Sequence, residues 1–313
     1  MNDHYQTKSP VLFIIFNRPE TTRRVFEQIR QSRPSRLYIA ADGPRTDKPD
    51  EGTLCADARK IADEVDWPCD VKTLFRETNL GCKEAVSAGI TWFFDQEEEG
   101  IVLEDDCLPA NDFFRFCDTM LEKYRHDTRI RHICGSNYQH GKKWGTASYY
   151  FSNLTHVWGW AGWRRVWQEY DKELTQYHAE DVRPQLETIF TDRFIVEVWG
   201  NIFKHLKAGD IDTWDYQLTY LNFFNNSLSV IPNVNLVSNI GFGQQATNTV
   251  NQHSLNANMP LQQLGTIVHP VYILPAKEAD SDTLNYEFEI PRRWKKYNKP
   301  KYKLKRWFKG LFK

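Results

Sequence analysis

The first hundred residues alternate between short strand-like runs and segments with helical periodicity. The strand-like runs lie at residues 11–16, 37–41, 71–75 and 101–103. Between them, apolar side chains recur at helical spacing at residues 21–31, 53–65 and from 82 to about 95. This β-α-β-α-β-α-β order predicts a parallel, Rossmann-like sheet flanked by helices, and therefore an α/β fold.

The pattern is less regular after residue 106. Helical periodicity is found at 111–125 and 183–207, and another helical segment opens around 210–215 and runs through Tyr220. Shorter strand-like runs occur at 149–151 and 228–232. Residues 244–290 show no clear period, and we interpret them as loops with little regular structure.

Polar side chains follow each of the first four predicted strands. They are Arg18, Asp42, Asn79 and the consecutive acids Glu104, Asp105 and Asp106. Ligands of open α/β sheets bind beyond the carboxyl ends of the strands, so we expect these groups at one crevice. The Gly-rich signatures of a dinucleotide site or a P-loop are absent from the sequence, which argues against an ordinary NAD or P-loop protein.

The three adjacent acids are the strongest chemical signal. Neighbouring carboxylates repel one another, so the cluster calls for a counter-cation. Mn²⁺ or Mg²⁺ prefers oxygen ligands and leaves positions open for phosphate oxygens. Taken alone, however, the triplet is equally consistent with a solvated acidic loop after a strand.

Two further groups of residues are candidates for binding or catalysis. Trp158 and Trp160 offer flat faces for stacking on a sugar or a base, whereas Trp163 and Trp167, one helical turn apart, are expected in the core. Asp212 has the character of a helix N-cap, and a carboxylate at Asp215 suits the first turn of the same helix.

Composition limits the class of protein. The fractions of hydrophobic and charged residues, 41% and 26%, are those of a globular protein. Six cysteines occur without a C-x-x-C pair, which favours free thiols, and the sequence contains neither an apolar leader nor an apolar stretch long enough to span a bilayer. We therefore expect a cytoplasmic protein.

Seven short motifs within residues 10–245 carry a resemblance to a known family. They are FNRPE (16–20), ADG (41–43), NLG (79–81), VLEDD (102–106), GWAGW (159–163), TWDYQL (213–218) and NIGFG (239–243). With these motifs in this order, the chain resembles metal-dependent glycosyltransferases of the GT-A fold. It is similar in particular to the α-mannoside N-acetylglucosaminyltransferase I family and to bacterial glycosyltransferases often labelled haemolysin-related.

The resemblance implies a nucleotide-sugar donor, UDP-linked in the first instance. Arg18 would meet the diphosphate, Asp42 the uracil edge, and Asp106 would hold Mn²⁺ or Mg²⁺. Glu104 and Asp105 would hydrogen-bond the ribose and the donor sugar. The remaining candidates for donor binding are Asn79, Lys83, Trp158 and Trp160.

The resemblance also implies a general base at Asp215. Eukaryotic relatives have two adjacent acids where this chain has Asp215 and Tyr216, so Asp212 is a second candidate. Many bacterial relatives have a histidine after the GFG motif, where this chain has Asn248, and His253 lies nearby.

The implied reaction is transfer of a sugar, with inversion, to a hydroxyl of a glycan or lipid-linked acceptor, as in bacterial surface polysaccharide synthesis. One alternative is a sugar-1-phosphate nucleotidyltransferase, although residues 16–19 lack the Gly-rich basic loop expected there. Another is a glycan-binding or scaffold protein that uses the tryptophans without catalysis.

The sequence divides into a body and a basic tail. Residues 1–290 are predicted to form one domain, with a nucleotide-sugar half at 10–106 and an acceptor half at 107–245. Residues 292–313 carry 11 Lys or Arg and no acid, although the whole chain has a net charge of −1. Leu304, Trp307, Phe308 and Leu311 fall on one face of a predicted amphipathic helix. The tail at 291–313 predicts contact with the inner face of an anionic membrane, whereas the acidic body argues against nucleic acid.

Overall fold

The computed structural model describes residues 4–242 and 256–303. Its elements up to residue 104 follow the predicted alternation. They are β1 (Val11–Ile15), α1 (Pro19–Ser32), β2 (Arg36–Ala41), α2 (Glu51–Arg59), the 3₁₀ helix η1 (Lys60–Glu64), β3 (Asp70–Phe75), α3 (Cys82–Phe94) and β4 (Glu99–Glu104). The second predicted helix is thus divided, because its last turn tightens into the 3₁₀ form at Lys60.

The remaining elements extend the same sheet and add a helical region. They are β5 (Cys107–Pro109), α4 (Asn111–Tyr124), β6 (Ile130–Cys134), β7 (Tyr149–Ser152), β8 (Trp160–Trp163), α5 (Arg164–Trp167), α6 (Ala179–Ile189), α7 (Arg193–Lys207), α8 (Asp215–Phe224), β9 (Leu228–Pro232), β10 (Val237–Asn239), α9 (Lys277–Glu287) and α10 (Ile290–Tyr297).

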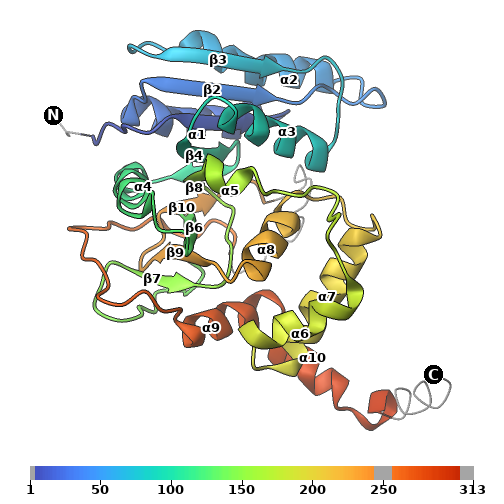
Figure 1. The fold of residues 1–313 in the computed structure, drawn as a ribbon. Helices are drawn as coiled ribbons and strands as arrows, with labels where there is room; N and C mark the ends of the chain where they lie inside the picture. The colour runs from blue at the N-terminus through green and yellow to red at the C-terminus, as the bar shows by residue number, and fades with distance from the viewer. Residues whose placement is uncertain (1–3, 243–255, 304–313) are drawn as a thin grey trace.

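One eight-stranded sheet runs through the molecule in the order β3-β2-β1-β4-β8-β6-β9-β7. The first four strands in this order are parallel, β8 runs antiparallel to both of its neighbours, and β7 is an antiparallel edge strand. In Figure 1, β3, β2 and β1 lie at one end of the molecule, and α6, α7, α9 and α10 at the other. The predicted α/β fold, with a largely parallel sheet flanked by helices, is confirmed.

The apolar run of β1 is continuous because both faces of the sheet are covered there. Val11, Phe13 and Ile15 belong to the core that contains the buried face of α1, whereas Leu12 and Ile14 pack with the buried face of α3. All five residues of β1 are buried. A strand buried on both faces does not alternate apolar and polar residues, and this is why the run was readable as a central strand.

The interpretation of residues 244–290 as loops is wrong for α9. Ala279 and Leu284 of this helix are buried, but so are Asp280 and Thr283. The buried face is therefore half polar, which removes the apolar period that predicts a helix. Residues 243–255 lie outside the described residues.

Asp280 gives the unfolding free energy a pH dependence that can be measured. Burial raises the pKa of Asp280 from its ordinary 3.8 to about 6, although Ser152 and the Asn153 amide donate hydrogen bonds to it. A carboxyl group whose folded pKa is raised binds more protons in the folded state, so stability falls as pH rises from about 4 to about 6.

We expect Asp280→Asn to remove this pH dependence of the unfolding free energy. The difference in unfolding free energy between variant and wild type should shift by about 2 kcal/mol in favour of the variant between pH 4 and pH 7. Urea unfolding at both pH values measures it, with Glu278→Gln, an exposed carboxylate of the same helix, as the control. A difference that does not change with pH would contradict the assignment.

Two further findings bear on the sequence predictions. Trp163 and Trp167 are buried, at 2% and 5% exposure, so their assignment to the core is confirmed. No helix in the described part of the chain is both long and apolar enough to cross a membrane.

Candidate active site

A cavity of about 750 Å³ lies at the carboxyl ends of β1 to β4. It is lined by residues that follow these strands and by the segment before and at the start of α8. Most of the predicted site residues line it: Arg18, Asp42, Asn79, Glu104, Asp105, Asp106, Trp158, Asp212 and Asp215. Groups that are up to 197 positions apart in the sequence, from Arg18 to Asp215, therefore share one cavity.

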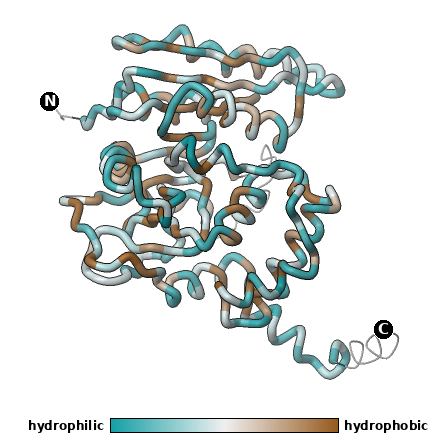
Figure 2. Tube along the Cα trace, in the orientation of Figure 1, coloured by the Kyte–Doolittle hydropathy of each residue, from teal (hydrophilic) through white to brown (hydrophobic). Residues whose placement is uncertain are grey.

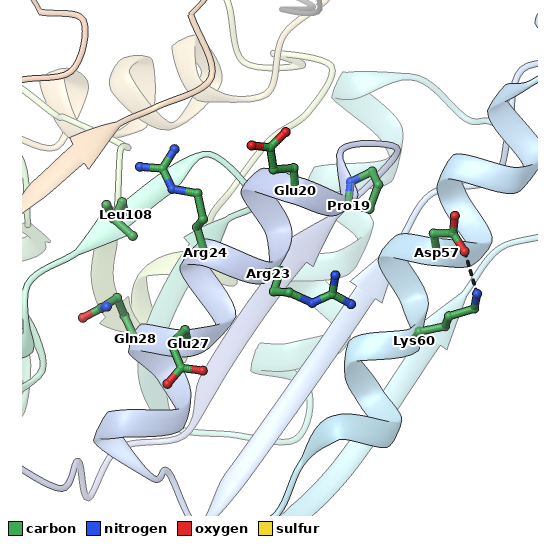
Figure 3. Close-up of a pocket in the computed structure, with 9 residues that line it drawn as sticks. All are labelled: Pro19, Glu20, Arg23, Arg24, Glu27, Gln28, Asp57, Lys60 and Leu108. Atoms are coloured by element: carbon green, nitrogen blue, oxygen red, sulfur yellow. Dashed lines mark hydrogen bonds and ion pairs between the residues drawn. The ribbon is translucent and has the colours of Figure 1, made fainter.

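A second hollow, of about 930 Å³, is a surface groove along α1 and α2 (Figure 3). Its walls carry charged side chains of both signs, among them an ion pair between Lys60 and Asp57 at 2.6 Å. Apart from Pro19 and Glu20, at the start of α1, the groove does not contain the strand-end motif residues. We therefore place the candidate site in the strand-end cavity, where polar groups converge.

Arg18 neutralises part of the acidic triplet. Its guanidinium contacts Asp105 Oδ1 at 2.7 Å through Nη2 and Asp106 Oδ2 at 2.8 Å through Nη1. The Phe16 amide donates to the second oxygen of Asp105 at 3.1 Å. The short connection from β1 to α1 is therefore bound to Asp105 and Asp106, the two residues that follow β4.

Burial shifts the acid–base behaviour of the triplet. It raises the pKa of Glu104 to about 8, with further contributions from the charges on Asp106 and Asp105. Burial also raises the pKa of Asp105 to about 6, against the lowering effect of Arg18. The cluster therefore carries fewer than three negative charges near neutral pH.

The residues present fit a divalent cation that is bound by only one or two carboxylates of the protein. Among the described residues, three or more His, Cys, Asp and Glu side chains are nowhere arranged to hold a metal. Within residues 4–242 and 256–303, the hydrogen bond recorded at Asp106 Oδ1 is that from the Cys107 thiol, at 3.4 Å. Mg²⁺ is often bound by one or two carboxylates, with the other positions left to water and phosphate oxygens, and Asp106 suits that arrangement.

Asp42 has a structural role in addition to any contact with a ligand. Its carboxylate accepts hydrogen bonds from the amides of Gly43, Leu80 and Gly81 and from the side chain of Asn79 at 2.8 Å. A carboxylate has about four acceptor positions, so these donors occupy most of its capacity. Asp42 and Asn79 therefore hold the loop before α3 against the end of β2.

Two of the predicted donor-binding residues lie outside the cavity lining. Trp160 is 3% exposed and stacks between His132 and Trp214 in the core. Lys83 forms an ion pair with Glu173 at 3.2 Å on the surface of α3. The sequence prediction for Trp160 is corrected accordingly, because a buried tryptophan cannot stack on a ligand in the cavity.

Asp215 lines the same cavity as the triplet. It is in the first turn of α8, accepts a hydrogen bond from the Thr213 hydroxyl, and has a pKa raised by burial. Its charge is also one of the influences that raise the pKa of Glu104. Asp212, in contrast, is exposed at the rim and does not cap α8 through its side chain. Asp215 is partly buried, and a carboxylate with a raised pKa is suited to accept a proton.

Four cavity-related residues were not predicted from the sequence. The buried Glu51 accepts from the Asn17 side chain at 2.8 Å and from the Arg45 amide at 2.7 Å, and it also pairs with the Arg45 guanidinium. Arg45 in turn lies over the Phe16 ring at 5.7 Å. This network ties the loops after β1 and β2 together at the base of the cavity.

Arg76 is the fourth of these residues. It follows β3 directly and lines the cavity. Burial raises the pKa of Asp42, and the charge on Arg76 opposes that rise. Arg18 and Arg45 are each paired with carboxylates, whereas Arg76 has no such ion pair within the described residues. The strand-end rule that selected Asn79 would have selected Arg76 as well.

Glu287, at the end of α9, is another unpredicted neighbour of the site. Part of its side chain is open to solvent, but the surrounding protein and the charge on Asp215 raise its pKa to about 7. Asn248 and His253, together with Gly243 of the last motif, lie outside the described residues.

Comparisons with known proteins yield no family assignment. No family model matches the chain. No curated protein matches it either. Solved structures with partial likeness include 4-diphosphocytidyl-2C-methyl-D-erythritol synthase from Anaerococcus prevotii DSM 20548, at 10% identity and a TM-score of 0.30, covering 52% of this chain and 76% of that one.

Two other structures show a similar degree of likeness. HddC from Yersinia pseudotuberculosis is 12% identical with a TM-score of 0.32, covering 52% of this chain and 80% of that one. UDP-glucose pyrophosphorylase in complex with UDP-glucose is 12% identical with a TM-score of 0.29, covering 51% and 78%. Likeness at this level establishes neither a shared family nor a shared activity, and the fold class rests on the sheet topology.

Proposed function

We propose that the protein is a glycosyltransferase that moves a sugar from a nucleoside diphosphate, UDP in the first instance, to a hydroxyl of a glycan or lipid-linked acceptor. One observation supports the proposal: Arg18 and the acidic triplet at the strand ends share a cavity with the partly buried carboxylate of Asp215. Arg18 and the triplet suit the leaving group of a displacement reaction, and Asp215 suits the attacking hydroxyl.

In the proposed reaction the acceptor oxygen attacks the anomeric carbon of the donor sugar. The bond from that carbon to the diphosphate oxygen breaks, and its electron pair leaves with the nucleoside diphosphate. Asp215 accepts the proton of the attacking hydroxyl. Attack from the face opposite the leaving group inverts the anomeric configuration.

The leaving diphosphate needs positive charge near it. Arg18 is the guanidinium next to the triplet and can neutralise that charge. Asp106 would hold Mn²⁺ or Mg²⁺, which acts as a Lewis acid on the phosphate oxygens. Arg76, the cation without a carboxylate partner within the described residues, can contribute attraction for the nucleotide as a whole.

The connection after β1 argues against a nucleotidyltransferase. β1 ends at Ile15 and α1 begins at Pro19, so only residues 16–18 connect them. That loop is too short to wrap a triphosphate and contains no glycine. Incubation with a nucleoside triphosphate and a sugar 1-phosphate tests this alternative directly.

Calorimetric titration of UDP with and without Mn²⁺ tests the proposal. We expect binding that depends on the metal, and a loss of about tenfold in affinity in Arg76→Ala, equivalent to about 1.4 kcal/mol. Arg24→Ala, an exposed arginine in the groove of Figure 3, is the control with the same change of charge. Failure of UDP, GDP and dTDP to bind under both conditions would leave the non-catalytic alternative.

A further inference from the structure

An apolar tip projects from the edge of the sheet beside β7. The tip consists of residues 269–275, and both of its ends are fastened. The Ser148 amide donates to the Val268 carbonyl at 2.8 Å, and the Ala276 amide donates to the Phe151 carbonyl at 2.7 Å. Because Phe151 belongs to β7 and Ser148 directly precedes it, the tip is anchored at both ends on the edge strand.

The side chains of this tip are unusually exposed. Val271, Tyr272 and Leu274 are 85%, 75% and 70% exposed, and they are the most exposed large hydrophobic residues of the described chain. Residues 265–276 also contain no Asp, Glu, Lys or Arg. Single exposed apolar residues are ordinary, but three within four positions on an anchored loop mark a contact surface.

A basic surface lies one helix further along the chain. α9 has 11 residues and is about 16 Å long at 1.5 Å per residue. Beyond it, residues 290–303 contain no acid and carry seven exposed cations: Arg292, Arg293, Lys295, Lys296, Lys299, Lys301 and Lys303. Figure 2 shows this stretch as mostly hydrophilic, and Figure 1 places α9 and α10 at the end of the molecule away from β3.

We propose that the tip and α10 together dock the protein on an anionic lipid bilayer, with the tip entering the interface and the cations of α10 contacting the headgroups. Trp294, half exposed on α10, has the amphipathic character found at such interfaces. This surface is separate from the strand-end cavity, and the proposal does not rest on the proposed transfer reaction.

A bilayer fits these observations better than a protein partner does. A specific protein interface buries about 800 Å² on each side, which three side chains of a narrow tip do not supply. A symmetric contact with a second copy would bring two sets of α10 cations together, which is unfavourable. A bilayer needs no complementary shape, and anionic headgroups attract clustered lysines and arginines.

Flotation of the full chain with vesicles tests the proposal. We expect binding to vesicles of phosphatidylcholine with phosphatidylglycerol and not to phosphatidylcholine alone. Val271→Ser with Tyr272→Ser and Leu274→Ser should reduce binding at least about tenfold. Lys295→Glu with Lys296→Glu should reduce it by a similar factor, and added salt should weaken the wild type and the tip variant by screening the α10 contacts.

Control variants replace exposed apolar residues and reverse exposed charges at the other end of the molecule. Leu54→Ser with Phe75→Ser alters exposed apolar residues, and Arg24→Glu with Lys60→Glu reverses charges in the groove of Figure 3. Both should bind vesicles as the wild type does. Thermal unfolding of each variant checks that the fold is retained. The proposal is wrong if the wild type does not float with anionic vesicles, or if either the tip variant or the α10 variant binds as well as the wild type.

Discussion

Asp215→Asn lowers the rate of sugar transfer by about 10²- to 10⁴-fold and leaves the affinity for UDP within a factor of two. The expected loss is that of a positioned general base, which removes a proton as the new bond forms. Asparagine has the same shape and can still accept the hydrogen bond from Thr213, so the wall of the cavity should keep its structure. Steady-state kinetics with a UDP-sugar and calorimetry with UDP separate the two effects.

The pH profile gives this prediction a second readout. Burial raises the pKa of Asp215, and a base acts only when it is deprotonated. Transfer by the wild type should therefore decline as pH falls through a pKa above the ordinary aspartate value, and the residual activity of Asp215→Asn should lack that decline.

Asp212→Asn is the matched control, because Asp212 lines the same cavity but is exposed at its rim. If Asp212→Asn loses transfer and Asp215→Asn retains it, the second candidate is the base. If both variants turn over at the wild-type rate, neither Asp212 nor Asp215 is the general base, and the assignment is wrong.

The nucleotide half of the fold was predictable because its strands are buried on both faces. The continuous apolar run of β1 marks it as a central strand, and polar residues after each strand necessarily gather at one edge of the sheet. Arg18, Asp42 and the triplet could be assigned to one cavity from their positions alone. Their partners could not, because the pairing of Arg18 with two acids depends on side-chain geometry.

The error in the sequence prediction for Trp160 has a local physical cause. Trp158 and Trp160 should point to the same side of an extended chain, since side chains alternate along a strand. Gly159 between them has a φ of 63°, a left-handed conformation that interrupts the alternation, and a side chain there would collide with Val237. Trp158 therefore reaches the cavity while Trp160 enters the core.

Contacts between distant segments around the site were the hardest to foresee. Glu287 approaches Asp215 only because α9 folds back across the molecule, and the buried face of α9 is half polar. Glu51 is buried and pairs with the partly exposed Arg45 six positions away, which a sequence presents as two ordinary loop charges. Local patterns identify the elements and the strand ends, but contacts between distant loops depend on the assembled structure.

The second large effect is expected at Asp106. Asp106→Asn should weaken UDP binding in the presence of Mn²⁺ by about 100-fold, equivalent to about 2.7 kcal/mol, and should remove the difference between titrations with and without the metal. Asparagine preserves the volume at this position, where the backbone at Gly241 packs directly against Asp106 and Arg18. The loss would therefore report the missing charge rather than a rearranged loop.

Arg18→Ala separates the role of the divalent metal from that of the Arg18 guanidinium. In the structure Arg18 occupies Asp106 Oδ2 and Asp105 Oδ1, so a metal at Asp106 must share the carboxylate with Arg18 or displace it. If the metal binds as proposed, Arg18→Ala weakens UDP binding but preserves its dependence on Mn²⁺, whereas Asp106→Asn abolishes that dependence. A different result would contradict the metal assignment: UDP binds the wild type equally well in EDTA, and only Arg18→Ala loses UDP binding. The guanidinium alone would then neutralise the diphosphate, and the divalent cation would have no place in UDP binding.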